Sequence, residues 1–263
     1  MTSPAVKLMM ASGGAGVSLP DAITALSPAG YWKLDETSGS TATDSSSNAR
    51  DGTYTQIDLA TYLGGDSVDY AGMGSPNNPM YVTISDNDDW SIGAGMTVFV
   101  LCYPDDFGGD GGSASIMLAR LDNISGNQFE WAISAAIDAG STSYLDVLKC
   151  NAGFTSYRIA QSSTKALTSG EWNAVVVRFT SDSVTAADDF WVNSSTELGQ
   201  GTPTVVGTGT AAGTTARLSL GNRRDATNQR WDGGLAHVAI FNYELSDSEI
   251  GDLLIAAANE GWT

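Results

Sequence analysis

The stretch that decides the fold is residues 172–179, WNAVVVRF. Val175, Val177 and Phe179 alternate along it with residues 174, 176 and 178. Successive side chains of a strand point to opposite faces of a sheet, so these two sets are expected on opposite faces. The run of β-branched valines favours a strand as well. The sequence therefore predicts a strand at this position.

Shorter segments of the same kind occur on both sides of this stretch. They are separated by clusters of turn-forming residues and recur about every 8–12 residues, with no helical pattern between them. They lie at 31–34, 52–55, 67–71, 80–84, 96–103, 115–121, 129–135, 143–148, 155–160, 190–192, 216–220 and 235–241. Residues 96–103 form an almost continuous apolar run, which is typical of a strand covered on both faces. This spacing predicts an all-β protein, an antiparallel sandwich or barrel.

One helix is predicted at the C-terminal end, over residues 246–258. Ser246 and Glu249 have the spacing of a capping box, and Leu245 and Ile250 hold the staple positions around it. The apolar stripe of this helix consists of Ile250, Leu253, Leu254 and Ala257, and Gly261 lies past its end. We expect the helix to pack on the rim of the sandwich rather than on a partner.

The N-terminal residues have a different composition. Residues 1–28 are rich in Gly, Ala, Ser and Pro, with a short helical turn around 21–26, and they predict an arm that docks the protein elsewhere. The domain proper is expected over 29–263. Residues 1–19 contain only a broken apolar run, so no secretory signal is predicted, and no stretch approaches the ~18 apolar residues of a membrane helix.

The charge balance excludes several classes of partner. The 263 residues include 30 acidic and 12 basic side chains, for a net charge of −18. Such a surface repels the phosphates of nucleic acids and the anionic face of a membrane, so neither is expected as a partner. It attracts cations instead, and it also fits a protein in salty water, where self-repulsion is screened.

Histidine and cysteine bound the chemistry further. His237 is the one histidine, so the sequence cannot supply a cluster of histidine zinc ligands, and we expect this residue to be structural. Cys102 and Cys150 lie near the ends of apolar runs and are expected as buried thiols. Their pairing is left open.

Four segments contain short sequence motifs that are informative when taken together. They are YWKLDETSG at 31–39, followed by DSS at 44–46 and DGTY at 51–54; GEWNAVVV at 170–177; WVN at 191–193; and WDGGLAHVAIFN at 231–242. In this order they resemble the laminin-G-like, concanavalin A-like jelly-roll family over residues 29–254. The resemblance implies two stacked sheets with Trp32, Trp172 and Val238 in the core. The glycines at 233 and 234 would allow a tight turn or bulge before the last strand.

Glycosidases and lectins both occur in the superfamily that this wording resembles. Its glycosidases place carboxylates on one strand as E-x-D-x-E, so that one acid protonates the leaving group while another attacks. The sequence has no such motif, and Glu130 and Glu171 are isolated. We therefore expect no enzymatic activity.

Calcium is the cofactor that the resemblance implies, at the rim of the sandwich. Calcium takes 6–8 oxygen ligands, which acid-rich loops supply. The candidate ligands are Asp86, Asp88 and Asp89 in one loop and Asp105, Asp106 and Asp110 in another. Where the family often has an acidic pair, this chain has Ala236 and His237, so a ligand set of the family type is not expected there.

Sugar binding would require exposed aromatic rings. The candidates are Trp231, Tyr157, Tyr144 and Trp90.

The opening segment also resembles the opening of phage virion proteins that carry such a domain. The leading hypothesis is a non-enzymatic structural protein on the surface of a phage particle, either a head decoration or a tail or fibre appendage. It would dock on other virion proteins through residues 1–28 and assemble as a homo-oligomer, with a host-surface glycan as a further candidate partner. The alternative is an extracellular, calcium-dependent carbohydrate-binding adhesion module of a bacterial surface.

Overall fold

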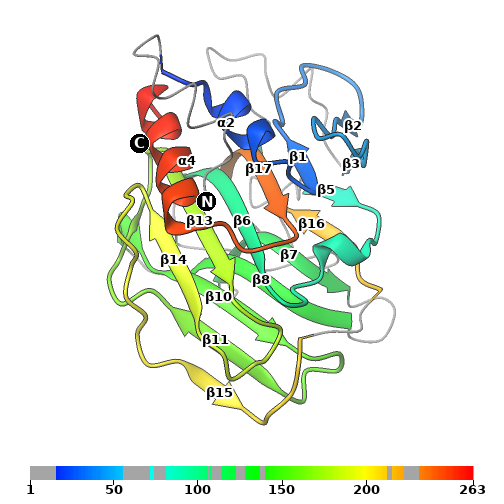
Figure 1. The fold of residues 1–263 in the computed structure, drawn as a ribbon, viewed down its shortest axis with the longest axis vertical. Coiled ribbons are helices and arrows are strands. Elements are labelled where there is room, and N and C mark those ends of the chain that lie inside the picture. The colour runs from blue at the N-terminus through cyan, green and yellow to red at the C-terminus, as the bar shows by residue number, and fades with distance from the viewer. Residues whose placement is uncertain are drawn as a thin grey trace.

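The computed structural model describes residues 16–55, 72–73, 81–105, 107, 114–122, 128–136, 140–211, 215–221 and 231–262. Within these ranges two antiparallel β-sheets pack face to face, and two α-helices cover the outer face of the smaller sheet (Figure 1). This confirms the predicted all-β jelly-roll sandwich with one C-terminal helix. The segment 67–71, predicted as a strand, lies outside the described residues.

In the part of the chain that the structure describes, the smaller sheet has six strands. Its order is β1-β17-β6-β13-β14, with β4 paired to β17. The bounds are β1 Gly30–Trp32, β4 Gly72–Met73, β6 Met96–Pro104, β13 Asn173–Phe179, β14 Asp188–Val192 and β17 Gly233–Phe241. The first strand thus pairs with the last, which brings both ends of the domain to one sheet.

The larger sheet has nine strands within the described residues, in the order β15-β11-β10-β8-β7-β16-β5-β3-β2. The bounds are β2 Thr41–Ala42, β3 Gly52–Thr55, β5 Tyr81–Ile84, β7 Ala114–Asp122, β8 Gln128–Ala136, β10 Leu145–Cys150, β11 Tyr157–Gln161, β15 Thr204–Val206 and β16 Leu218–Leu220. A two-stranded ribbon joins β9 Thr142–Ser143 to β12 Leu167–Thr168. The 3-10 turn η1 spans Asp88–Trp90.

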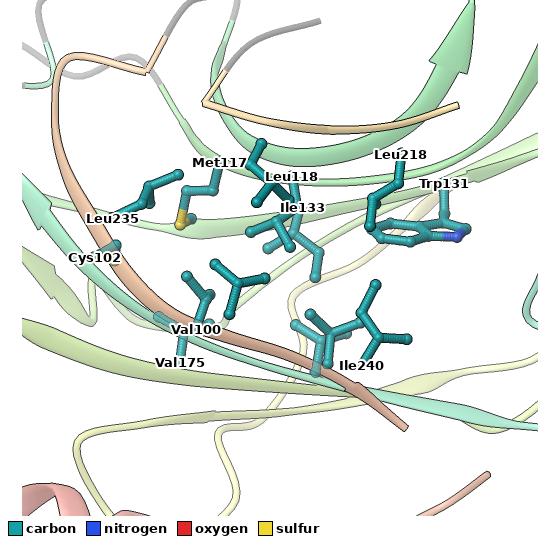
Figure 2. Packing of buried hydrophobic residues seen from close by; sticks show 14 of the residues in the cluster. Val100, Cys102, Met117, Leu118, Trp131, Ile133, Val175, Leu218, Leu235 and Ile240 are labelled. Atoms are coloured by element: carbon teal, nitrogen blue, oxygen red, sulfur yellow. The ribbon is translucent and has the colours of Figure 1, made fainter. Parts of the chain in front are cut away.

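The main core fills the space between the two sheets. Val100, Val175 and Ile240 of the smaller sheet face Ile133 and Trp131 of the larger one (Figure 2). In β13 the predicted alternation is confirmed, since residues 175, 177 and 179 belong to this core while 174 and 176 belong to a second one. Both faces of β13 are therefore buried, which explains why residues 174–177 are all apolar.

The second core lies between the outer face of the smaller sheet and the helices α2 (Leu19–Ala25) and α4 (Asp247–Asn259). Figure 1 shows the two helices next to each other, with α4 alongside β13 and α2 near β1 and β17. The N-terminal part contributes Val17, Leu19, Ala22, Ile23 and Leu26, all buried. Residues 16–28 are therefore part of the packed domain, which corrects the prediction of an arm for this part of 1–28. Residues 1–15 lie outside the described chain.

The C-terminal helix begins as predicted. The Ser246 hydroxyl accepts from the Glu249 amide, and the Glu249 carboxylate accepts from the Ser246 amide. Leu245 and Ile250 are buried, and Gly261 follows the helix with φ +83°. Among the described residues, no helix is both long and apolar enough to cross a membrane.

A β-bulge interrupts β17 between Ala236 and Ala239. His237 lies in it with φ +48°, and its amide donates to the Lys33 carbonyl of the neighbouring segment. The bulge reverses the alternation, so Leu235 faces the main core while Ala239 and Phe241 face the second core. Strict alternation along β17 would place His237 on one face with Leu235, Ala239 and Phe241, and the bulge prevents this. Gly233, at the start of the strand, is required by close approach, since a Cβ there would lie 1.9 Å from the Tyr103 carbonyl oxygen.

Both cysteines are buried and unpaired with each other. Cys102 lies in the main core, and Cys150 lies in a small cluster with Ile116, Ala119 and Ala132. Burial raises the pKa of both thiols, that of Cys150 to about 12, so neither thiol ionises near neutral pH.

Candidate functional site

The first predicted metal loop surrounds η1. The Asp86 carboxylate pairs with Arg120 at 2.9 Å, and Asp89 pairs with Arg50 and accepts from the Asn242 amide at 2.8 Å. Two of the three carboxylates are thus held by arginines, which compete with a cation for the same oxygens. Asp88 is the third, and it is the first residue of η1.

These residues do not fit a calcium ion as they stand. In the described ranges no three His, Cys, Asp or Glu side chains gather closely enough to hold a metal. Asp105 follows the last residue of β6, and its amide donates to the Asp232 carbonyl. Asp106 and Asp110 lie outside the described residues. The second predicted loop can therefore be placed only at Asp105.

Arg120 links the first loop to a carboxylate in the core. Its side chain is fully buried and pairs with Glu130, also fully buried, at 2.9 Å. Glu130 accepts as well from the Ile92 amide at 2.9 Å. Removing one partner of such a pair strongly destabilises the fold, because the remaining charge would be buried alone. Glu130 therefore belongs to the architecture of this end of the sandwich, and Glu171 lies exposed elsewhere.

A second buried cluster of charges joins the sheets at the other end. Lys149 of β10 lies 2.8 Å from Asp188 of β14 and donates to the carbonyls of Ser181 and Ala186. Burial raises the pKa of Asp188 to about 6, and Lys149 opposes that rise. Arg158 approaches the same carboxylate at 3.9 Å and donates to Gln200 at 2.6 Å. This cluster links β10 of the larger sheet to β14 of the smaller sheet.

The four aromatic residues predicted to stack on sugars do not come together. Trp90 and Trp231 are 0% and 1% exposed, and their indole N–H groups donate to the carbonyls of Ser85 and Gly234. A buried ring offers no face to a ligand, so the prediction is wrong for these two residues. Tyr144 and Tyr157 are half-buried at separate places. Tyr144 has the Lys165 ammonium 5.8 Å from its ring, and Tyr157 stacks on Phe154 with centroids 4.7 Å apart.

A different set of aromatic rings forms a row on the outer face of the smaller sheet. Tyr103 of β6 lies 5.5 Å from Trp172, and Trp172 lies 5.0 Å from Trp262, between ring centroids. All three rings are half-buried, so each presents part of its surface to solvent. We call these three residues the aromatic row. It lies where β6, β13 and the end of α4 meet.

The aromatic row is supported from beneath by His237 and Tyr31. His237 lies 5.6 Å from Trp262 between ring centroids, and its Nδ1 lies 2.7 Å from the Tyr31 hydroxyl. Burial lowers the pKa of His237 to about 4, so the ring is neutral at pH 7. His237 is thus held in the structure by Tyr31 and Trp262, and a purely structural role for it stays a prediction.

Carboxylate oxygens flank one end of the row. Glu260 accepts from the Trp262 indole at 3.2 Å and from the Leu19 amide at 2.8 Å. At the other end Gly234 leaves room for Trp172, since a Cβ there would lie 3.1 Å from the indole. The arrangement combines apolar ring surface with hydrogen-bond acceptors, a combination suited to a ligand that has apolar and hydroxylated faces.

The aromatic row is not among the surfaces predicted from the sequence. Trp172 was expected in the main core, yet it lies in the outer layer with Ala174 and Val176. Side chains alternate along a strand, so the sequence pattern of 172–179 already puts residue 172 on the face opposite Val175 and Val177. This alternation is the signal that could have placed Trp172 in the outer layer. Nothing local in the sequence singles out Tyr103 or Trp262.

Two shallow hollows adjoin the η1 loop. One has a volume of about 340 Å³ and is lined by residues that include Asp88, Gly93, Tyr243 and Glu244. The other, of about 390 Å³, is lined by residues that include Arg50 and Asp86. The first combines carboxylates with a partly exposed tyrosine and is the second surface with the chemistry of a polar ligand site.

The fold and these surfaces define a lectin-like jelly roll. The chain belongs to the concanavalin A-like lectin/glucanases superfamily, whose laminin-G-type family model matches residues 77–251. No curated protein has a sequence that matches the chain significantly.

Solved structures share the fold at low identity. Domain 4 of AbnA, a GH43 extracellular arabinanase from Geobacillus stearothermophilus in complex with arabinotriose, is 16% identical with a TM-score of 0.54, over 86% of this chain and 98% of that one. Botulinum neurotoxin type C, whose cell entry depends on interaction with two ganglioside molecules, is 12% identical with a TM-score of 0.58, over 88% of this chain and 51% of that one. Trypanosoma rangeli sialidase is 14% identical with a TM-score of 0.60, over 98% of this chain and 38% of that one. This chain thus spans about half or less of the last two, and at these identities the likeness shows the fold alone.

Proposed function

We propose that this domain is a non-catalytic module that contacts carbohydrate through the aromatic row. The observation that carries the proposal is the series Tyr103, Trp172 and Trp262, three adjoining rings that are partly exposed on one face. Aromatic faces pack against the C–H face of a sugar ring, and neighbouring oxygens can accept from its hydroxyls. Glu260 supplies such oxygens beside Trp262. The glycan ligands of structural neighbours support the same class of ligand.

The non-catalytic part of the proposal rests on the carboxylates. Glycoside hydrolysis uses two carboxyl groups about 5–9.5 Å apart on either side of the bond to be cleaved. Glu130 and Asp188, which are the buried carboxylates nearest the core, are engaged by Arg120 and Lys149. An acid held in an ion pair within the structure is a poor proton donor to a substrate.

A glycan array, followed by calorimetry on the best ligand, tests the function and the site together. We expect binding that is weakened about tenfold or more by Trp172→Ala, which corresponds to a loss of ~1.4 kcal/mol or more. Tyr144→Ala removes a half-buried ring elsewhere and is the matched control. Since the first metal loop does not fit calcium, chelator should leave binding unchanged.

The outcomes separate the site from the function. Loss of binding in Tyr243→Ala or Glu244→Gln, with Trp172→Ala unaffected, would move the site to the 340 Å³ hollow and keep the function. If no glycan binds the folded protein, the proposed function itself is wrong. Hydrolysis of a bound oligosaccharide would contradict the non-catalytic role.

We further propose that the module is carried on the surface of a phage particle, because the sequence of residues 31–54 resembles the opening of phage virion proteins. Because residues 16–28 are packed in the domain, attachment to other virion proteins would involve residues 1–15 rather than the whole predicted arm. Deletion of 1–15 should leave the unfolding free energy unchanged and abolish incorporation into particles. Normal incorporation of the shortened chain would contradict this attachment.

A further inference from the structure

The strand β15 forms an open edge of the larger sheet. It pairs with β11 on one side, and among the described residues no strand pairs with its other side. In Figure 1 it lies at the far end of the sheet from β2 and β3. An edge strand leaves alternate N–H and C=O groups directed outward, ready to pair with another strand.

The side chains around this edge are apolar and exposed. Val205 and Val206 of β15 are 41% and 40% exposed, and Ile159 of β11 and Phe154 beside it are 39% and 38% exposed. Val206 lies opposite Tyr157 in the register, so residues 157, 159 and 206 share one face of the sheet. Val205 lies opposite Arg158 and points to the other face, so the edge presents apolar side chains on both of its faces. The five residues other than Arg158 form what we call the β15 patch. Four of the six large apolar side chains that are exposed in the described chain belong to it.

Phe154 adds a second observation. It has φ +57°, a left-handed conformation that is uncommon for a bulky residue and costs about 1 kcal/mol or more. In this conformation its ring stacks on that of Tyr157, with an interplanar angle of 21°. An aromatic side chain kept exposed at such a cost indicates a surface that is covered in the working state of the protein.

The charge distribution favours a second copy of this chain as the occupant of the patch. The chain carries a net charge of −18, yet no charged residue occurs between Glu197 and Arg217, or between Lys149 and Arg158. Lys149 and Arg158, which flank the patch in sequence, are buried against Asp188. Two copies of so acidic a chain repel each other over most of their surface, and an uncharged region is where they can approach closely.

We propose that the β15 patch is the surface through which two copies of this chain associate, with β15 pairing antiparallel to its symmetry mate. A strand paired antiparallel with itself is self-complementary, so a two-fold axis near Val205 satisfies both edges at once. Pro203 and Gly207 bound the strand to three residues, which keeps the pairing short and the assembly closed. This contact is independent of the aromatic row on the other sheet.

Sedimentation velocity of the full chain over a range of concentrations tests the proposal. We expect a reversible monomer–dimer equilibrium that tightens as salt is raised, because salt screens the repulsion between the two acidic copies. Val205→Lys combined with Val206→Lys should raise the dissociation constant about tenfold or more, since it places like charges across the axis. The matched control is Ile255→Lys on α4, an exposed isoleucine outside the patch, which should leave the constant within about twofold.

Two further measurements keep the test decisive if the lysine pair disturbs folding. Phe154→Asn suits the left-handed conformation, removes the ring and should also weaken the dimer. Amide exchange of residues 204–206 should slow on dimerisation, because the backbone itself is paired. A chain that stays monomeric at all concentrations and salts overturns the proposal, as does a dimer that Ile255→Lys weakens while the β15 variants do not.

Discussion

Replacing Ile23 with alanine tests whether the N-terminal helix is an integral part of the domain. Ile23 lies on α2, is fully buried and belongs to the second core together with residues of α4 and of the smaller sheet. If residues 16–28 were a dispensable docking arm, the substitution would not change the unfolding free energy. If α2 is integral to the domain, as the burial indicates, the change should be large.

The magnitude follows from what the substitution removes. Ile to Ala deletes about three buried carbon groups, worth ~0.8 kcal/mol each, or ~2.4 kcal/mol in transfer free energy. The cavity that remains adds to this, and measured Ile→Ala changes in cores span about 2–5 kcal/mol. We therefore expect Ile23→Ala to lower the free energy of unfolding by about 2–5 kcal/mol. The urea dependence m should stay the same, because the surface exposed on unfolding hardly changes.

Urea unfolding followed by tryptophan fluorescence gives both quantities. Ile255→Ala is the control, since it is the same substitution on a helix at a side chain that is 52% exposed. It should change the unfolding free energy by no more than about 0.5 kcal/mol. Equal small effects of the two variants would refute the reasoning and restore residues 16–28 to the role of an arm.

Two other substitutions test the bulged strand β17. Gly233→Ala should lower the free energy of unfolding by about 3 kcal/mol or more, because its Cβ would lie 1.9 Å from the Tyr103 carbonyl oxygen. The control is Gly153→Ala, which has open space around it and φ +85° and should lower the same quantity, measured by urea unfolding, by only about 1–2 kcal/mol. The pKa of His237 is about 4 in the folded protein against 6.5 for an unperturbed histidine, so the unfolded chain binds the proton first and stability falls as pH falls from about 6.5 to about 4. His237→Asn suits the positive φ and should lack this decline in the free energy of unfolding, which is worth roughly 3 kcal/mol at most. The measurement compares urea unfolding curves at pH 7 and pH 4. The raised pKa of Asp188 acts in the opposite direction, but it does so equally in both proteins. An equal pH dependence in the two proteins would show that His237 is not the group responsible.

Most strands could be predicted because their signal is local. Alternation over 172–179 and the apolar run at 96–103 appear as β13 and β6 with ends shifted by a residue or so. The capping box at Ser246 is equally local and begins α4 as expected. Strands of two or three residues, such as β2, β9, β12 and β15, are too short to show a periodicity. Their existence depends on the partner strand that they meet.

The bulge at His237 and the packing of α2 depended on distant parts of the chain. The bulge follows from pairing β17 with β1 and β6 at once, and the Lys33 carbonyl that receives the His237 amide lies far away in sequence. For α2 a local signal did exist, since Leu19, Ala22, Ile23 and Leu26 have the spacing of one helical face. The Gly- and Ser-rich residues before it concealed this pattern within an apparent arm.

The surface rings illustrate why the site was harder to predict than the fold. A tryptophan satisfies its N–H equally well beneath a backbone carbonyl, as Trp90 does, or beside a carboxylate at the surface, as Trp262 does. Residue type therefore cannot distinguish a core ring from one that meets a ligand. The row of Tyr103, Trp172 and Trp262 exists only because β6 lies next to β13 and α4 ends over them. A surface of this kind is a product of strand order, and strand order is the part of a jelly roll that local pattern does not contain.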